Sequence, residues 1–396
     1  MARKHHTTIC REGWYFLVIM GFIVGGAMMR QINLLMVIAG MMGGLLLYNW
    51  RAVVVAMKGL EVRRRLPEGI CAGDLLVVDL ELTSTCGRGS ARSIAVEDKI
   101  RRDGSRRASE QQRGRVLFPP VPAGTIGHAS YQGRLLRRGR YRFGPMVAST
   151  RFPLGFVRRT LRIDAMATMM VCPRLGRLTP AWGSLHKQAL RGVRRVRRQQ
   201  NVMDAEFFGL RDWQEGDSQR SIHWRTSARR GGLVVKQSVQ QRQQDLLLVI
   251  DLWQPDKPSE DQLEHVERAV SFAATVVADL CRHGGSQLDV AISGATPETT
   301  RGTASMARLN ELMEQLAVVD AHAGDGLFDL VRRARRNSRR DTTTLVVGTR
   351  PVDFARPREE GWMPSDPPPD DRLGGPVIAI DASSDTLQQY FVADSS

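Results

Sequence analysis

The spacing of hydrophobic residues changes along this 396-residue chain and predicts three structural regions. The first holds two uninterrupted apolar runs, Trp14 to Met29 and Ile32 to Tyr48, separated by Arg30 and Gln31. Runs of about this length are near the lower limit for a helix that crosses a hydrocarbon core of about 30 Å. We therefore predict a membrane helical hairpin within residues 1–60.

Basic residues flank both outer ends of this hairpin: Arg3, Lys4, Arg11, Arg51, Lys58, Arg63, Arg64 and Arg65. Because basic flanks stay on the cytoplasmic side, we expect a two-helix protein of a bacterial inner membrane with both termini cytoplasmic. Two alternatives are a signal peptide cleaved near Gly25 to Ala27 and a buried hairpin of a soluble protein. The second apolar run, directly after the first, argues against cleavage.

Residues 61–180 change to a period of two, which indicates half-buried strands. Leu76, Val78, Leu80 and Leu82 alternate with more polar positions. Further short strands are predicted at Ser93–Val96, Arg115–Phe118, Ala129–Leu136, Arg140–Val147, Gly155–Ile163 and Thr168–Cys172. Short strands separated by Gly and Pro favour an all-β, sandwich-like domain. The basic stretch from Arg137 to Tyr141 is predicted to be a hairpin turn with Gly139 at its tip.

Residues 241–396 alternate strand and helix patterns and predict a doubly wound α/β domain. Asp245 to Asp251 forms an apolar run that ends in Asp, which is typical of a central parallel strand. Glu260 to Arg282 carries apolar residues on one helical face. The acidic, proline-rich stretch 364–371 is predicted to be a flexible loop.

The composition limits the function classes. A formal net charge of +16 favours acidic partners such as anionic lipid, nucleic acid or an acidic protein surface. Five widely spaced cysteines without a Cys-x-x-Cys pair argue against a disulfide framework or a zinc site. No nucleophile elbow, phosphate-binding loop or zinc-protease motif occurs, so we expect no enzyme.

Residues 181–240 join the two predicted domains and hold the most distinctive motif. The run 191–198 is strongly basic and fits either a solvated linker or an anionic-ligand patch. The motif that follows crowds six polar and aromatic candidates together: Arg211, Asp217, Arg220, His223, Trp224 and Arg229. Alternation at Ile222 and Trp224 predicts a strand. The motif is either a structural ion-pair network held by buried tryptophans or an anionic docking site.

The segment from Leu210 to Arg229 closely resembles the signature of the domain of unknown function 58 family. The matching residues are Arg211, Trp213, Gly216, Asp217, Arg220, Ile222, His223, Trp224, Ala228 and Arg229. Arg137–Tyr141 and Phe152–Phe156 resemble further family segments, although Phe152 stands where the family usually has Asp. The resemblance implies a membrane protein often encoded beside MoxR-type AAA+ ATPases and transglutaminase-like proteins, with no established activity.

The C-terminal domain resembles a von Willebrand factor A-like domain, a fold that usually binds Mg²⁺ through an Asp-x-Ser-x-Ser loop. Asp251 keeps the first ligand, but Trp253 and Pro255 replace the serines, and Asp325 stands where Thr is expected. Mg²⁺ needs oxygen ligands, so Asp251 and Asp325 form a degenerate site at most. We expect no cofactor and weak or absent Mg²⁺ binding.

These observations predict a membrane-anchored, non-enzymatic scaffold or adaptor. Its expected partners are the lipid bilayer and a protein, in particular a MoxR-type AAA+ ATPase, acting in protein-complex assembly or cell-envelope processes. The alternative is a nucleic-acid- or anionic-lipid-binding protein that uses its basic surface. Nucleic acid is the less expected ligand, because the basic run has no interleaved aromatic residues to stack on bases.

Overall fold

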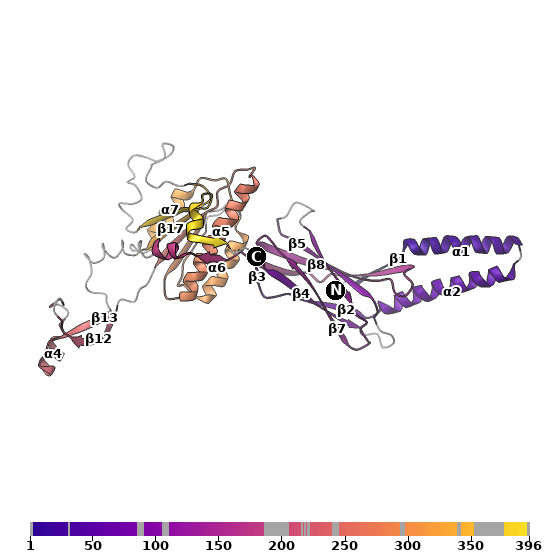
Figure 1. Cartoon of the computed structure of the whole chain (residues 1–396), viewed down its shortest axis with the longest axis horizontal. Helices are drawn as coiled ribbons and strands as arrows, with labels where there is room; N and C mark the ends of the chain where they lie inside the picture. The colour runs from indigo at the N-terminus through magenta and orange to yellow at the C-terminus, as the bar shows by residue number, and fades with distance from the viewer. Residues whose placement is uncertain are drawn as a thin grey trace. The chain divides into compact units, whose positions relative to one another are not determined.

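The chain folds into two compact units, Met1–Arg174 and Leu175–Ser395, in a computed structural model (Figure 1). The described residues are 3–30, 32–84, 91–104, 111–185, 206–214, 217, 219, 222–239, 245–293, 298–338, 342–351 and 376–393. The basic run 191–198, the proline-rich stretch 364–371, Gly216 and Arg220 lie outside them, as do the predictions made for them.

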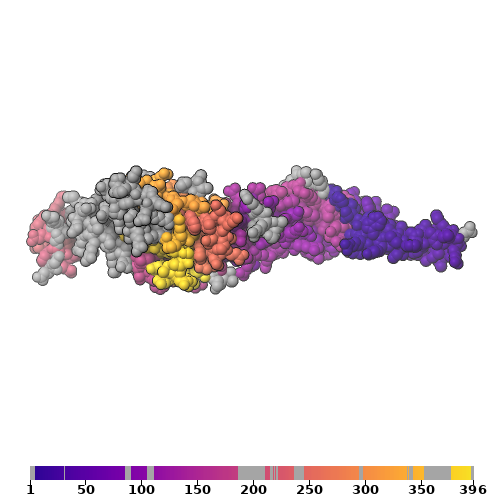
Figure 2. Space-filling view, turned by 90° about the horizontal axis from the view of Figure 1, so that it is seen from above, coloured from indigo at the N-terminus to yellow at the C-terminus, as the bar shows by residue number. Residues whose placement is uncertain are grey.

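Two apolar helices lie near the start of the first unit, α1 (Arg11–Arg30) and α2 (Asn33–Ala56), and both are long enough to span a membrane. The two helices pack against each other. In the most hydrophobic 18-residue stretch of each helix, only 11% is buried. Large side chains such as Phe22 and Met29 are therefore exposed along the helix pair, drawn in indigo in Figure 2. Apolar side chains in such numbers favour a lipid environment.

The rest of the first unit consists of two sheets. The larger sheet has the order β1-β9-β8-β10-β3, with β5 also paired to β8 and β6 paired to β5. Its strands are β1 (Arg3–Ile9), β3 (Ile70–Cys71), β5 (Ile94–Arg102), β6 (Gln112–Phe118), β8 (Gly139–Thr150), β9 (Val157–Ile163) and β10 (Ala167–Cys172). The smaller sheet has the order β2-β4-β7, formed by β2 (Leu60–Arg65), β4 (Leu75–Ser84) and β7 (Ile126–Arg134).

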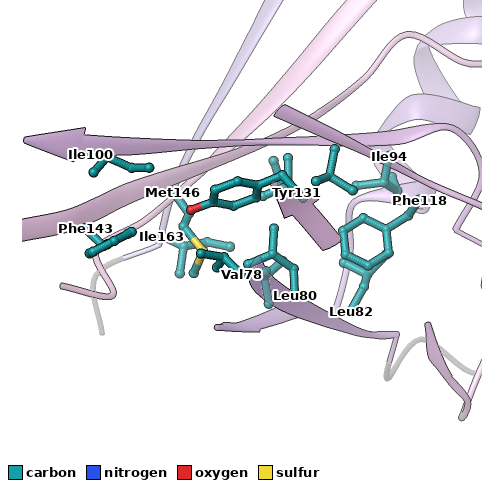
Figure 3. Packing of buried hydrophobic residues seen from close by; sticks show 14 of the residues in the cluster. Val78, Leu80, Leu82, Ile94, Ile100, Phe118, Tyr131, Phe143, Met146 and Ile163 are labelled. Atoms are coloured by element: carbon teal, nitrogen blue, oxygen red, sulfur yellow. The ribbon is translucent and has the colours of Figure 1, made fainter. Parts of the chain in front are cut away.

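One hydrophobic core joins the two sheets (Figure 3). Val78, Leu80 and Leu82 of β4 are fully buried at every second position, which confirms the period-two prediction for this strand. They pack in the same cluster as Phe143 and Met146 of β8. Because residues from both sheets share this core, the predicted two-layer β arrangement is present.

Two features of this unit differ from the sequence pattern. Residues 3–9, which the sequence marked only as a basic flank of the first helix, form β1, which pairs antiparallel with β9 along its whole length. Residues 137–141 are not a hairpin turn, because β7 and β8 belong to different sheets. The chain crosses between the sheets there, with Leu135 and Arg138 buried and Gly139 at a φ of 132°.

The second unit is built on a five-stranded sheet of order β16-β15-β14-β17-β18. Its strands are β14 (Leu246–Asp251), β15 (Leu288–Ser293), β16 (Glu298–Thr300), β17 (Thr343–Gly348) and β18 (Val377–Asp381). All neighbours are parallel except the pair β15–β16. Every residue of β14, β15 and β17 is buried, as expected of central strands covered on both faces.

Helices cover this sheet. They are α5 (Glu260–His283), α6 (Met306–Val318) and α7 (Leu327–Asn337). A capping box between Ser259 and Gln262 starts α5, and α7 packs its leucines on Leu247 and Val249 of β14. The short elements β11 (Gly176–Leu178), α9 (Thr386–Tyr390) and β19 (Phe391–Ala393) complete the unit, with β11 paired to β19.

A separate two-stranded hairpin in this unit carries the motif residues. It consists of β12 (Glu206–Asp212) and β13 (Val234–Val239), with the short helix α4 (Trp224–Arg230) between them.

Candidate functional site

The central strand of the second unit ends in a buried carboxylate. Asp251 is the last residue of β14, and in the sheet register it lies between Ser293 of β15 and Gly348 of β17. Its side chain is fully buried. Ligands of open parallel sheets bind beyond the carboxyl ends of the strands, so this edge is the first place to look for a site.

Arg350, two residues beyond β17, lies between the two predicted metal ligands. Its Nε is 3.7 Å from Asp251 Oδ2, and its Nη2 forms an ion pair with Asp325. The guanidinium carbon lies 5.0 Å from the centre of the Trp253 ring. We call Asp251, Trp253, Asp325 and Arg350 the carboxyl-edge cluster.

The electrostatics of this cluster are those of a buried acid with an internal counter-ion. Burial raises the pKa of Asp251, and the nearby Arg350 guanidinium acts in the opposite direction. Only 17% of the Arg350 side chain is exposed, so the attraction is weakly screened by solvent. Next to the cluster, the Ser293 hydroxyl and His322 Nε2 are 3.0 Å apart and hydrogen-bonded.

The cluster brings together Asp251 and Asp325, the residues predicted as a degenerate metal site, and the Arg350 guanidinium lies between them. Within the described ranges no group of three or more His, Cys, Asp or Glu side chains is arranged to hold a metal ion. A divalent cation bound by Asp251 and Asp325 must therefore displace Arg350. Sequence reasoning missed Arg350, although its place just after the apolar run 343–348 marks it as a residue at the same edge.

The hairpin around β12 and β13 is held by its own polar groups. Arg211 Nη2 and Asp217 Oδ1 are 2.6 Å apart, and the Gln214 amide donates to Asp217 Oδ2 at 3.0 Å. These hydrogen bonds hold the pKa of Asp217 below its usual range. The predicted contact of Asp217 with Arg211 is therefore present.

His223 caps the N-terminus of α4. Its Nδ1 accepts from the Thr226 amide at 3.3 Å, and its own amide donates to the Val234 carbonyl at 2.8 Å. Ser227 is buried and its hydroxyl accepts from the Val234 amide at 2.9 Å. Gly231 ends the helix in a left-handed conformation, with a φ of 72°.

Two predictions for this motif are wrong. Trp224 is the first residue of a helix rather than part of a strand, and Ile222 forms only an isolated bridge to Val235. The structural alternative, in which Trp224 is a buried anchor, is also contradicted, because Trp224 is 66% exposed. Arg225 and Arg229 are exposed on the same helix. We call Trp224, Arg225 and Arg229 the α4 face.

Both sites fall within one region of similarity to known proteins. The family model described as "Protein of unknown function DUF58" matches residues 209–355, from the hairpin to beyond Arg350. The chain is also similar to the "Uncharacterized protein YeaD" of Bacillus subtilis (strain 168), with 24% identity over 156 residues. The match covers 39% of this chain and 36% of YeaD, so it spans about a third of that relative's length.

Solved structures add little. The alkylpurine DNA glycosylase AlkC of Pseudomonas fluorescens has 14% identity and a TM-score of 0.21, covering 31% of this chain and 32% of that chain. The superoxide reductase (neelaredoxin) of Ignicoccus hospitalis has 14% identity and a TM-score of 0.19, covering 28% of this chain and 79% of that chain. Likeness at this level carries no argument about fold or function.

Proposed function

We propose that this chain is a membrane-anchored, non-enzymatic adaptor, and that the α4 face is its docking surface for a protein partner. The observation that carries the proposal is that the short helix α4 exposes Trp224 together with Arg225 and Arg229. Trp and Arg are the residue types most enriched among side chains that dominate binding energy at protein interfaces. A 66% exposed indole has much apolar area still to bury.

The hairpin supports this proposal because it is held together without the α4 face. Its ion pair joins Arg211 to Asp217, its helix cap is His223, and its buried residues include Ile222 and Ser227. None of these contacts uses the Trp224 ring or the Arg229 guanidinium. A docking surface on a scaffold that is held by its own contacts keeps its structure when the partner dissociates.

The partner that we propose is a MoxR-type AAA+ ATPase that presents an acidic, apolar-lined surface. The two exposed arginines of the α4 face fit such a surface, and the resemblance of the motif to the domain of unknown function 58 family suggests the ATPase. The process served is protein-complex assembly or cell-envelope function. We further propose that α1 and α2 anchor the chain in the inner membrane with both termini in the cytoplasm. The basic flanks support this orientation.

We also propose that the second unit is a von Willebrand factor A-like domain that works without metal. A buried Asp at the carboxyl end of the central parallel strand supports the fold assignment. The ion pairs of Arg350 with Asp251 and Asp325 support metal independence, because the guanidinium supplies the positive charge that the two carboxylates require.

Binding of the purified full chain in detergent to the MoxR-type ATPase encoded beside it tests the proposal. Trp224→Ala and Arg229→Ala should each weaken binding by about tenfold or more while leaving the unfolding midpoint unchanged. Arg282→Ala, which removes an exposed arginine at the end of α5, is the matched control and should bind like wild type. Wild-type affinity in Trp224→Ala would refute the docking surface, and so would a large fall in its unfolding midpoint.

A further inference from the structure

The part of the helix pair that is available to cross a membrane is shorter than the helices themselves. The base of the pair is tied to the loop 152–156 of the β domain. Phe16 of α1 stacks on Phe156 with ring centres 4.4 Å apart, and the Leu154 amide donates to Asn49 Oδ1 of α2 at 3.0 Å. Asn49 is fully buried by this contact.

The remaining length sets the depth of that loop. At about 1.5 Å per residue, Phe16 to Arg30 spans about 21 Å and Asn33 to Asn49 about 24 Å. A hydrocarbon core is about 30 Å thick, and about 40–45 Å with both headgroup layers. Both spans are about 6–9 Å shorter than the hydrocarbon core, so with Arg30 at the far interface the bilayer thins around the helix pair and the loop 152–156 lies at the near edge of the hydrocarbon.

An open groove of about 390 Å³ lies along this loop. Arg115, Arg151 and Arg158 line it together with the side chains of Ser149 and Thr150, and no acidic residue is among those that line it. At its rim, Leu117 is 67% exposed and Leu154 is 42% exposed. The Thr150 hydroxyl already donates to the Arg92 carbonyl, so the groove combines guanidinium donors and the Ser149 hydroxyl with apolar side chains. These groups lie at the depth where a phosphate meets an acyl chain.

The positive charge of the groove is not neutralised within the part of the chain that the structure describes. Arg158 Nε is buried and has no hydrogen-bond partner among the described residues. Arg115 is 3.8 Å from Glu97 in a largely exposed pair, which contributes little. Arg151 is exposed and forms no ion pair within the described ranges. A buried guanidinium nitrogen without a partner is costly, and an anion in the groove offsets that cost.

We propose that this groove binds the phosphate group of an anionic phospholipid, with Arg151 and Arg158 as the phosphate ligands and Leu117 and Leu154 in contact with the acyl chains. The site is independent of the α4 face and of the partner proposed for it. If the groove binds an anionic phospholipid, the position of the β domain on the bilayer depends on the charge of the membrane as well as on its apolar core.

Native mass spectrometry of the full chain in detergent, titrated with short-chain lipids, tests the proposal. Dihexanoyl phosphatidylglycerol should bind at least about tenfold more tightly than dihexanoyl phosphatidylcholine. Arg158→Gln and Arg151→Gln should each weaken phosphatidylglycerol binding by about tenfold or more, since each removes a charge-assisted hydrogen bond to phosphate. Arg140→Gln is the matched control, because Arg140 is exposed at the opposite end of β8 from the groove.

Three results would overturn the proposal. One is equal affinity for the two lipids. The second is full competition by inorganic phosphate at the same concentration, which would assign the groove to a soluble anion. The third is unchanged lipid affinity in both groove variants. If Arg158→Gln lowers the unfolding midpoint without lipid, the exposed Arg151→Gln variant decides the outcome. The α4 face is tested by a different measurement, the binding of the ATPase in detergent, so failure of one proposal can be told from failure of the other.

Discussion

Replacing Arg350 with Met should destabilise the second unit strongly, because it removes the counter-ion of a fully buried carboxylate. Arg350 Nε lies 3.7 Å from Asp251 Oδ2, and the Asp251 side chain is not exposed at all. Methionine keeps a flexible apolar side chain in place of the arginine's aliphatic stem. The main loss is therefore the guanidinium, with its charge and its contacts to Asp251 and Asp325.

The expected cost at pH 7 is about 3–5 kcal/mol, the usual range for removing one partner of a buried ion pair. For a unit of this size that corresponds to a fall of about 6–20 °C in the unfolding midpoint. Replacing both partners, in Asp251→Asn with Arg350→Met, should recover most of this loss, because no buried charge remains without a counter-ion. Arg350→Lys keeps a cation and should fall between wild type and Arg350→Met.

The loss should also depend on pH. Burial raises the pKa of Asp251, so the folded state favours its protonated form. That contribution to stability is fully present below the pKa of the unfolded chain, about 3.9, and is lost as pH rises through the folded pKa. Removing Arg350 raises the pKa of Asp251 in the folded state further. The protonated Asp251 then stabilises the folded state up to a higher pH. The stability difference between Arg350→Met and wild type should therefore shrink between pH 7 and pH 5.

Cys281 provides an assay that reports on this unit alone. It is a buried residue of α5, 3% exposed, so its thiol is alkylated only when the unit opens. Denaturant-dependent alkylation, followed by mass spectrometry of the Cys281 peptide, gives the free energy of opening in the full chain. The reasoning fails if Arg350→Met lies within about 1 kcal/mol of wild type at pH 7, or if acidification does not narrow the difference.

Three further outcomes are expected. Gly13→Val should weaken the docking of α1 on the β domain, since a Cβ there would lie 2.3 Å from the Phe156 carbonyl oxygen. Hydrogen exchange near Phe156 should become faster, and unchanged exchange would contradict the prediction. Tyr131→Phe should destabilise the first unit by about 1–3 kcal/mol in denaturant unfolding, because it removes a hydroxyl that donates at 2.8 Å to the buried Asp98 carboxylate. Asp98 then keeps the Arg64 ion pair and the Lys99 amide, and a loss of stability no larger than measurement error would refute this. Calorimetry of the full chain should detect no saturable Mg²⁺ binding at millimolar concentration, whereas a saturable transition that disappears in Asp251→Ala would overturn the expectation.

Features that depend on neighbouring residues were predictable from the sequence. The two apolar runs correspond to α1 and α2, and the alternation of β4 places Val78, Leu80 and Leu82 in the core. The long amphipathic helix at 260–282 is α5. In each case the periodicity of apolar side chains specifies both the element and its buried face. Such patterns also predicted that Asp251 ends a central strand.

Contacts between distant segments were decided only by the tertiary structure. The pairing of β1 with β9 joins residues 148 to 160 positions apart, and the ion pair between Asp251 and Arg350 joins residues separated by 99 positions. The sequence predicted a strand at Trp224 and, in one of two alternatives, a buried ring, yet Trp224 is the first residue of a helix capped by His223 and is exposed. No local pattern records which strands become neighbours, because sheet partners are selected by the burial that the whole domain achieves. The sequence by itself therefore determined which residues form most of the elements, and the packing of those elements decided which charges meet and which side chains stay exposed.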